Sequence, residues 1–435
     1  MRFVSTRNNK EQVSFSQAIL HCIAPDGGLY VPAYTENLSP WIMYMDNTTS
    51  FSSIAGSLTS ALIKEEFSPI ICEAIASKAF PFSPKIKKID ERLYIMELYH
   101  GPTGTNKDFG VSYLASCLEH ILLMQERQAI VLAVTEGDTG SCIAAAFREK
   151  KHLKSVLLYS KGSMRGFKDS DCVWNGGNIY PVEVDGDIEA CYKLARAIYS
   201  DTTLVEKYGL TLANTVNIGR LLPHSFLYMY AFSQLKNQEY GDLYYTLPAT
   251  NYGNLVAGLY SWKFSLPVNG FVTNSTPSVI VDPFGECSIL DSMVPLSLRG
   301  PSDPVNPSNI ERLEEVFTTN PAVLKGLVYP ANVTETEQRE AFQKLFVDYN
   351  EFVDPLTAKA YAASLKRNAL TSEDDGVTLL LAGDHPGFYT DTLKHWCGEE
   401  PTLPPELKEI CRPITPEKRI GCDKDSLIAI LEEIK

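Results

Sequence analysis

A lysine follows a loop rich in glycine and threonine at residues 100–106 and directly precedes an apolar helical pattern. Lys107 is therefore expected at the start of a helix, where the helix dipole and free backbone N–H groups favour anions. Taken alone, this is more often a solvated lysine than a functional one. The stretch predicts a candidate anion site and does not identify a reaction.

Two further loops carry small and polar residues between a predicted strand and a predicted helix. In residues 135–141 the glycines permit unusual backbone angles, and Thr139 or Ser141 could cap the helix. In residues 248–254 successive backbone N–H groups could surround a phosphate. Each loop alone is also typical of an ordinary capped turn.

Short apolar strands alternating with helices must position these loops. Helices are predicted at 109–123, about 139–149 and 423–434, and strands at 93–98, 129–134, 155–159, 179–184, 243–247, 270–274 and 377–382. Fully apolar short strands indicate a parallel sheet covered on both faces. The fold class is therefore α/β, with ligands beyond the carboxyl ends of the strands. Residues 279–307 are predicted to be a long irregular excursion.

The length of 435 residues exceeds what one compact core usually holds. We expect a mainly helical N-terminal unit at residues 1–88. Residues 89–210 are expected to contain Lys107 and a smaller, mobile α/β domain. Residues 211–435 are expected to form a larger α/β domain with the phosphate-type loop.

The net charge and the cysteine pattern limit the classes of partner and the compartment that are expected for this protein. The formal net charge of −14 argues against nucleic acid, which requires a basic face, but it does not exclude a phosphorylated small molecule. No apolar run suggests a secretion signal or a membrane span. The ten cysteines include no C-x-x-C pair, which indicates reduced thiols in a cytoplasmic protein without a zinc site.

The order and spacing of the motifs resemble the threonine synthase family of fold-type-II pyridoxal-phosphate (PLP) enzymes, which are tryptophan synthase β-like. The resemblance covers nearly the whole chain and is carried by residues 5–7, 24–32, 101–110, 137–140, 213–223, 251–254, 307–312, 354–358 and 385–386. It implies two open α/β domains with an N-terminal helical unit and the cofactor in the cleft between the domains.

The resemblance also implies roles for individual residues. The family converts O-phosphohomoserine and water to threonine and phosphate, with Lys107 holding PLP as a Schiff base and then shuttling protons. The cofactor phosphate would bind Thr250, Asn251, Tyr252, Gly253 and Asn254. Substrate contacts would come from Asp138, Thr139, Asn214, Asn217 and Arg220, although Arg220 could equally serve a structural ion pair.

Several positions depart from the family pattern. The family's usual residues are replaced by Asn106, Glu136, Ser170, Thr250, Leu356 and Phe388. Gly383 stands where the family's threonine hydroxyl meets the pyridine nitrogen of the cofactor. One hypothesis is that Asp384 reaches that nitrogen and keeps it protonated. Both residues are therefore predicted to contact the cofactor.

These departures leave two alternatives to threonine formation. One is a related PLP lyase that acts on another amino acid with a β or γ leaving group. The other is a catalytically silent paralogue that binds a ligand. For the leading interpretation, the expected partner is a small amino-acid phosphate, with neither nucleic acid nor membrane involved. The oligomeric state, monomer or homodimer, stays open.

Overall fold

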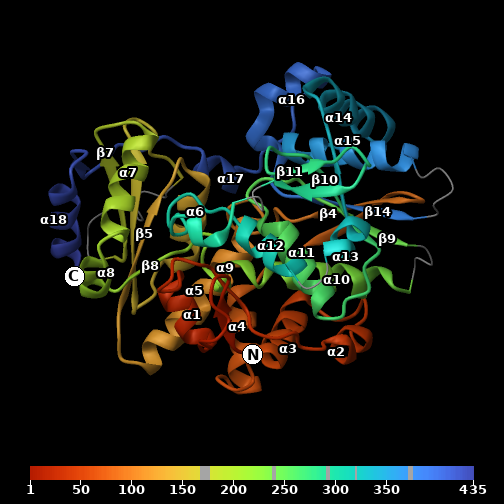
Figure 1. Cartoon of the computed structure of the whole chain (residues 1–435). Helices are drawn as coiled ribbons and strands as arrows, with labels where there is room; N and C mark the ends of the chain where they lie inside the picture. The colour runs from red at the N-terminus through yellow and green to blue at the C-terminus, as the bar shows by residue number, and fades with distance from the viewer. Residues whose placement is uncertain (167–176, 238–241, 291–293, 319–320, 371–375) are drawn as a thin grey trace.

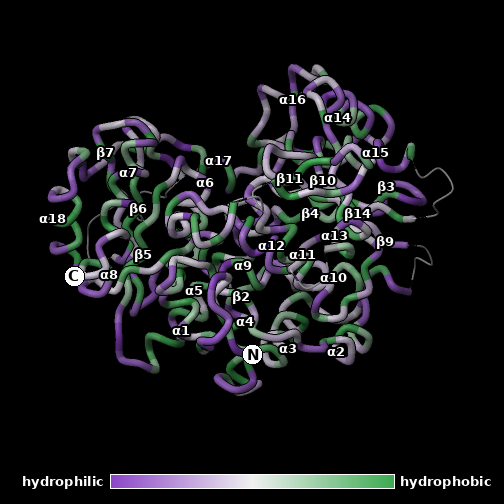
Figure 2. The backbone as a smooth tube through the Cα atoms, viewed as in Figure 1, coloured by the Kyte–Doolittle hydropathy of each residue, from purple (hydrophilic) through white to green (hydrophobic). Residues whose placement is uncertain are grey.

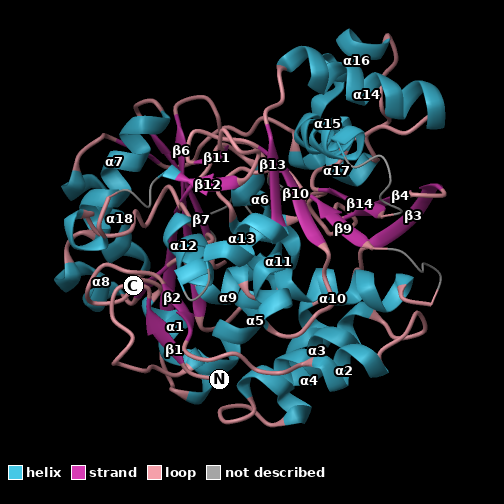
Figure 3. Ribbon diagram, turned by 45° about the vertical axis from the view of Figure 1, so that its right-hand side comes forward, coloured by secondary structure: helices cyan, strands magenta, loops and turns pink. Residues whose placement is uncertain are grey.

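Two open sheets, each with helices on both faces, form the frame of the molecule (Figures 1 and 3). The computed structural model describes residues 1–166, 177–237, 242–290, 294–318, 321–370 and 376–435. The five-stranded sheet has the order β15–β7–β6–β5–β8 and is parallel throughout. Its strands are β15 (Arg419–Ile420), β7 (Ile179–Val184), β6 (Leu153–Ser160), β5 (Ala129–Val134) and β8 (Leu210–Thr211).

The six-stranded sheet has the order β13–β10–β9–β14–β4–β3. Its strands are β13 (Val328–Ala331), β10 (Gly270–Asn274), β9 (Leu243–Thr246), β14 (Val377–Ala382), β4 (Leu93–Glu97) and β3 (Lys85–Asp90). Neighbouring strands are parallel, except that the edge strand β3 runs antiparallel to β4. Two small antiparallel pairs stand outside these sheets: β1 (Phe3–Ser5) with β2 (Tyr30–Pro32), and β11 (Val279–Val281) with β12 (Cys287–Ile289).

Helices of varied length connect and cover the sheets. In the first half of the chain they are α1 (Phe15–His21), α2 (Ser39–Tyr44), α3 (Phe51–Ile63), α4 (Pro69–Ala79), α5 (Lys107–Met124), α6 (Asp138–Phe147), α7 (Ile188–Tyr199) and α8 (Thr202–Tyr208). In the second half they are α9 (Ile218–Leu221), α10 (His224–Leu235), α11 (Gly253–Lys263), α12 (Ile310–Thr318), α13 (Pro321–Leu327), α14 (Glu335–Tyr349), α15 (Pro355–Leu370), α16 (Thr390–Cys397), α17 (Pro405–Ile410) and α18 (Lys424–Ile434). Short 3₁₀ turns lie at Leu296–Leu298 and Pro386–Tyr389.

Alternate residues of the central strands enter different hydrophobic cores, as the pleat of a strand requires. Val131 of β5 and Leu379 of β14 both belong to the largest core, which joins the inner faces of the two sheets. Ile130 packs into a second core with α7 and α18, and Leu380 into a third core with α14–α16. The hydrophobic course of these strands can be followed in Figure 2. Burial on both faces explains why the strands read as continuous apolar runs.

The sequence prediction of the central elements is confirmed. Strands β5, β10 and β14 have the predicted bounds, and α5 covers the predicted helix but begins two residues earlier, at Lys107. The expected excursion at 279–307 contains the hairpin of β11 and β12. The edge strand β3 was not predicted, because its alternating lysines and isoleucines lie on a partly exposed surface.

The two sheets do not coincide with the division of the chain at residues 88 and 210. Strand β4 joins the sheet built mostly from the C-terminal half, whereas β15 and α18 pack on the sheet of residues 129–211. Such crossings depend on long-range packing that local sequence patterns do not encode. Within the described ranges, no helix has the length and apolarity needed to cross a membrane.

A fully buried arginine ties the N-terminal unit to the second half of the chain. The Arg312 guanidinium donates hydrogen bonds to the carbonyl oxygens of Tyr30, Thr215 and Val216 and to Oδ1 of Asn309. Burial lowers the pKa of Arg312 to about 10. Its buried N–H groups are thus met by fixed protein oxygens, as burial of a polar group requires.

We predict that Arg312→Lys lowers the free energy of unfolding by about 2–4 kcal/mol, because one ammonium cannot reach all four acceptors. Urea denaturation of both proteins measures this difference. The matched control is Arg196→Lys, whose half-exposed side chain pairs with Glu189 and Asp303. That change should cost less than about 1 kcal/mol. Equal losses in the two variants would contradict the bracing role of Arg312.

Candidate active site

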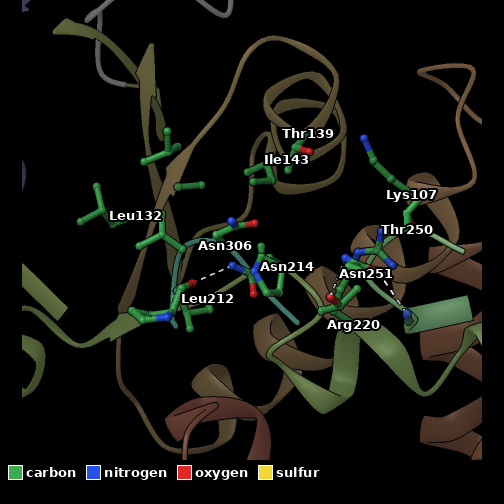
Figure 4. A pocket seen from close by; sticks show the side chains of 18 of the residues that line it. Lys107, Leu132, Thr139, Ile143, Leu212, Asn214, Arg220, Thr250, Asn251 and Asn306 are labelled. Carbon is green, nitrogen blue, oxygen red and sulfur yellow. Dashed lines mark hydrogen bonds between the residues drawn. The ribbon is translucent and has the colours of Figure 1, made fainter. Parts of the chain in front are cut away.

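A cavity of about 290 Å³ opens beyond the carboxyl ends of strands from both sheets (Figure 4). Its walls come from the start of α5, from β5 and α6, and from the loops that follow β8 and β9. The lining residues are Asn106, Lys107, Leu132, Ala133, Val134, Thr139, Ile143, Tyr192, Leu212, Ala213, Asn214, Thr215, Arg220, His224, Thr250, Asn251, Gly253, Asn254, Pro304, Val305, Asn306 and Pro307. The three loops singled out in the sequence therefore meet at one cavity.

Lys107 lies on the first turn of α5 and lines this cavity. Its Nζ pairs with the carboxylate of Asp138, which opens α6 from the other sheet. Burial disfavours the charged amine, but the carboxylates of Asp138 and Asp384 outweigh it and raise the pKa of Lys107. The amine is thus held charged and oriented across the junction between the sheets.

Backbone hydrogen bonds fix the loop that carries Lys107. The amide of Asn106 donates to the carbonyl of Gly383 at 2.7 Å, and the amide of His385 donates to the carbonyl of Gly104 at 2.9 Å. These bonds form a short antiparallel bridge between the loops after β4 and β14. Gly104 has a φ of +69°, which a side chain would strain.

The loop after β9 is shaped for close backbone approach at the start of α11. Tyr252 has a φ of +64°, and Oδ1 of Asn251 accepts the amide of Gly253 at 3.1 Å. The Asn251 amide donates to Oγ1 of Thr215, and Asn309 donates to the carbonyl of Asn251. Helix α11 begins at Gly253, so its free amides and its dipole favour an anion at this end of the cavity.

Arg220 lies beneath Lys107, beside Thr250 and Asn251 (Figure 4), and His224 lines the same cavity. Both side chains are buried, with exposed fractions of 5% and 4%. Nη1 of Arg220 donates to Nε2 of His224. Burial lowers the pKa of Arg220 to about 10, while burial and the Arg220 charge hold the pKa of His224 well below its usual range. The cavity therefore contains a buried cation supported by a neutral imidazole.

Among the predicted contacts, Thr139, Asn214, Thr250, Asn251, Gly253 and Asn254 join Lys107 and Arg220 at the cavity wall. Asp138 reaches the site through Lys107. Tyr252 does not line the cavity, because its left-handed backbone turns the ring away and its hydroxyl contacts Thr276. The fully buried Asn217 caps α9, and its amide donates to the carbonyls of Ile19 and Leu212. The Asn217 side chain therefore holds α1 and α9 together and does not line the cavity.

Gly383 and Asp384 are also absent from the lining residues. Oδ2 of Asp384 accepts the hydroxyl of Tyr389 at 2.8 Å, and its backbone amide points to the buried carboxylate of Asp354. Burial and the neighbouring Asp354 raise the pKa of Asp384 to about 6. The carboxylate acts on the site through its field on Lys107, and a direct contact with the cofactor ring stays a hypothesis.

Two of the departures from the family pattern contact each other. A Cβ atom added to Gly383 would lie 3.4 Å from Nδ2 of Asn106. Asn106 lines the cavity, and its side-chain amide lies beside the space that a side chain at position 383 would take. A change at one of these positions therefore alters the surroundings of the other.

The other departures lie at different distances from the cavity. Thr250 lines it, whereas Glu136 and Leu356 are exposed and Phe388 packs near Gly104 and His385. Ser170 falls outside the described residues. The repulsion that Glu136 could exert on an anion is therefore weakened by solvent.

Sequence reasoning missed His224 as a site residue and Asn309 as the support of the phosphate-type loop. His224 follows Arg220 by four residues, which is a helix-like spacing that could have identified it. Asn309 is distant in sequence from Asn251, so only the fold brings them together.

Comparisons with known proteins assign this fold and site to a class. Residues 79–383 match the family described as "Pyridoxal-phosphate dependent enzyme", a range that includes Lys107 and the loop at 248–254. Residues 2–80 match "Threonine synthase N terminus". The chain is thus a fold-type-II PLP-dependent enzyme.

Relatives that match nearly the whole chain indicate which family within this class the protein belongs to. The chain is 31% identical to threonine synthase from Escherichia coli over 412 residues, which is 94% of each chain, and 23% identical to that from Saccharomyces cerevisiae. The solved E. coli threonine synthase superposes with a TM-score of 0.79 at 27% identity over the whole of both chains. The PLP-bound threonine synthase from Brucella melitensis has a TM-score of 0.83 at 20% identity. The chain belongs to the threonine synthase family.

The residues of the cavity fit the cofactor that this family uses. The same space is lined by Lys107, by a helix-opening loop with close backbone approach and by the buried guanidinium of Arg220, which has no ion pair among the described residues. An aldehyde and a phosphate dianion on one small aromatic ring require these groups together.

We predict that Asp384→Asn raises the thermal unfolding midpoint of the cofactor-free protein at pH 8. The folded-state pKa, about 6, lies above the ordinary aspartate value, so the ionised carboxylate destabilises the fold as the pH rises through that range. The difference between the variants should shrink as the pH falls through about 6 and vanish below about 4. Melting curves across this range measure it. A difference that is independent of pH would contradict the assignment.

Proposed function

We propose that this enzyme converts O-phosphohomoserine and water to threonine and phosphate, with Lys107 as the lysine that binds PLP. The observation that carries the proposal is the meeting of Lys107 and the loop at 250–254 in one cavity of a chain related over 94% of its length to a threonine synthase. The cofactor supplies a sink for electrons from the α carbon and, after proton shifts, from the β carbon.

In this proposal, Lys107 holds the cofactor at the start of α5 and moves protons once its amine is released. The Asp138 carboxylate accepts a hydrogen bond from the Lys107 ammonium and stabilises its charge. The charged amine must lose its proton before it can attack a carbonyl. The raised pKa of Lys107 therefore opposes cofactor attachment at every pH below that pKa.

The remaining polar residues of the wall would receive the cofactor phosphate and the substrate. Thr250, Asn251, Gly253 and Asn254 form the anion-binding end at the start of α11. Thr139 and Asn214 lie on the other walls and would orient the amino-acid part of the substrate. The Asn214 amide also donates to the carbonyl of Pro304 at 2.7 Å, so the orientation of its side chain is fixed.

One observation favours a second candidate, a PLP lyase whose substrate has a less charged β or γ leaving group. Among the described lining residues, the positively charged side chains are Lys107 and Arg220. Two cations are few for a cofactor phosphate and a substrate phosphate together.

We propose a cytoplasmic location for either activity, on the cysteine pattern alone.

The test is to load the purified protein with PLP and record its visible absorption beside Lys107→Ala. We expect a band from the lysine-bound cofactor in the native protein and its loss in the variant. Turnover of O-phosphohomoserine, assayed as phosphate and threonine, should fall by at least about 10²–10⁴-fold when the proton-transfer group is removed. Lys161→Ala, which removes an exposed lysine paired with Asp185, is the control and should leave both signals unchanged.

The outcomes separate the candidates. A band without threonine formation, but with product from O-phosphoserine or O-phosphothreonine, would identify the alternative lyase. A band without turnover of any of these substrates would support a silent ligand-binding paralogue. No band in the native protein would contradict the assignment of Lys107.

A further inference from the structure

We propose that Arg220 is the buried counter-charge of the cofactor phosphate and that His224 is its positioning residue. Arg220 then serves neither as a substrate contact nor as a member of a structural ion pair. The inference deepens the proposed function, since it rests on PLP binding, but it does not depend on which reaction follows.

A buried guanidinium without a counter-charge is costly, because water no longer solvates it. Within the described ranges, no carboxylate lies at ion-pair distance from Arg220, which excludes the structural ion pair there. The acidic groups that partly offset the effect of burial on the pKa of Arg220 are Cys142 and Asp108. The Asp108 carboxylate is already engaged by the amide and hydroxyl of Thr103. The charge of Arg220 is therefore available to a ligand in the cavity that this side chain lines.

Arg312 provides the comparison within the same chain. Both guanidinium groups are buried, and burial lowers both pKa values to about 10. Arg312 has each of its nitrogens bonded to protein oxygens, whereas the hydrogen-bond partner of Arg220 among the described residues is His224. Arg312 is thus a structural arginine, whereas the donors of Arg220 face the cavity.

The contact with His224 determines the tautomer of the imidazole. Because Nη1 of Arg220 can only donate, Nε2 of His224 must accept, and the proton of the neutral ring lies on Nδ1. Nδ1 of His224 is buried and has no hydrogen-bond partner among the described residues. His224 therefore contacts the guanidinium through Nε2 and holds it in place without adding a charge.

The packing around Arg220 leaves its position little freedom. A Cβ atom on Gly110 would lie 1.9 Å from Nη1 of Arg220 and 2.2 Å from its carbonyl oxygen. Gly110 is one turn after Lys107 on α5, so the glycine admits the arginine directly beneath the lysine (Figure 4). Thr250 and Asn251 lie beside the same guanidinium. These positions favour the cofactor phosphate at the start of α11, and not a carboxylate of the substrate, as the anion that pairs with Arg220.

The test compares the binding of PLP with that of pyridoxal, which has the same aldehyde and ring but no phosphate. Equilibrium titration of the cofactor-free protein gives both dissociation constants without turnover. In Arg220→Gln, we expect the affinity for PLP to fall by about 10- to 100-fold, from the loss of charge-assisted hydrogen bonds. The affinity for pyridoxal should stay within about twofold. Arg220→Lys should recover part of the lost PLP affinity, because lysine restores the positive charge but not the planar, bidentate hydrogen bonding of a guanidinium.

The control is Arg299→Gln, which removes an arginine that pairs with Glu314 and does not line this cavity, and it should leave the ratio of the two affinities unchanged. Equal loss of PLP and pyridoxal binding in Arg220→Gln would overturn the proposal in favour of a structural role. Unchanged PLP binding with a raised KM for O-phosphohomoserine would overturn it in favour of a substrate contact. A native protein that prefers PLP over pyridoxal through Arg220 yet forms no threonine would uphold this inference while the proposed reaction fails.

Discussion

The site depends on the short backbone bridge between the loop before Lys107 and the loop after β14. Two amide-to-carbonyl bonds, from Asn106 to Gly383 and from His385 to Gly104, fix where α5 begins. Because β4 and β14 are parallel neighbours, both loops leave the sheet at the same edge. The lysine is therefore presented toward α6 of the other sheet, where Asp138 meets it. The bridge thereby fixes the start of α5 relative to β14.

Charge is distributed unevenly around that amine. On the side of α6 and β14, Asp138 and Asp384 raise the pKa of Lys107 and keep it protonated. On the opposite side, Arg220 and the start of α11 favour an anion. A ligand with a negative phosphate and a ring reaching toward the lysine is complementary to this arrangement. The two ends explain why a protein with a net charge of −14 can bind a phosphorylated cofactor.

Sequence patterns predicted the elements whose chemistry is local. The apolar runs of β5, β10 and β14 and the three glycine-containing loops are visible in the chain itself, and the loops meet as expected. The pairing of β15 with β7 across more than two hundred residues has no local signal. The same holds for side-chain direction: Tyr252 stands in the loop at 250–254, yet its backbone conformation turns it away from the cavity.

The central claim is that Lys107 is the residue bonded to the cofactor. The most direct measurement is to load the native protein with PLP, reduce the linkage with borohydride, and locate the modified residue by peptide mass spectrometry. The account predicts the modification on the peptide that contains Lys107 at near-stoichiometric yield. Modification of a different lysine, or of none, would contradict it.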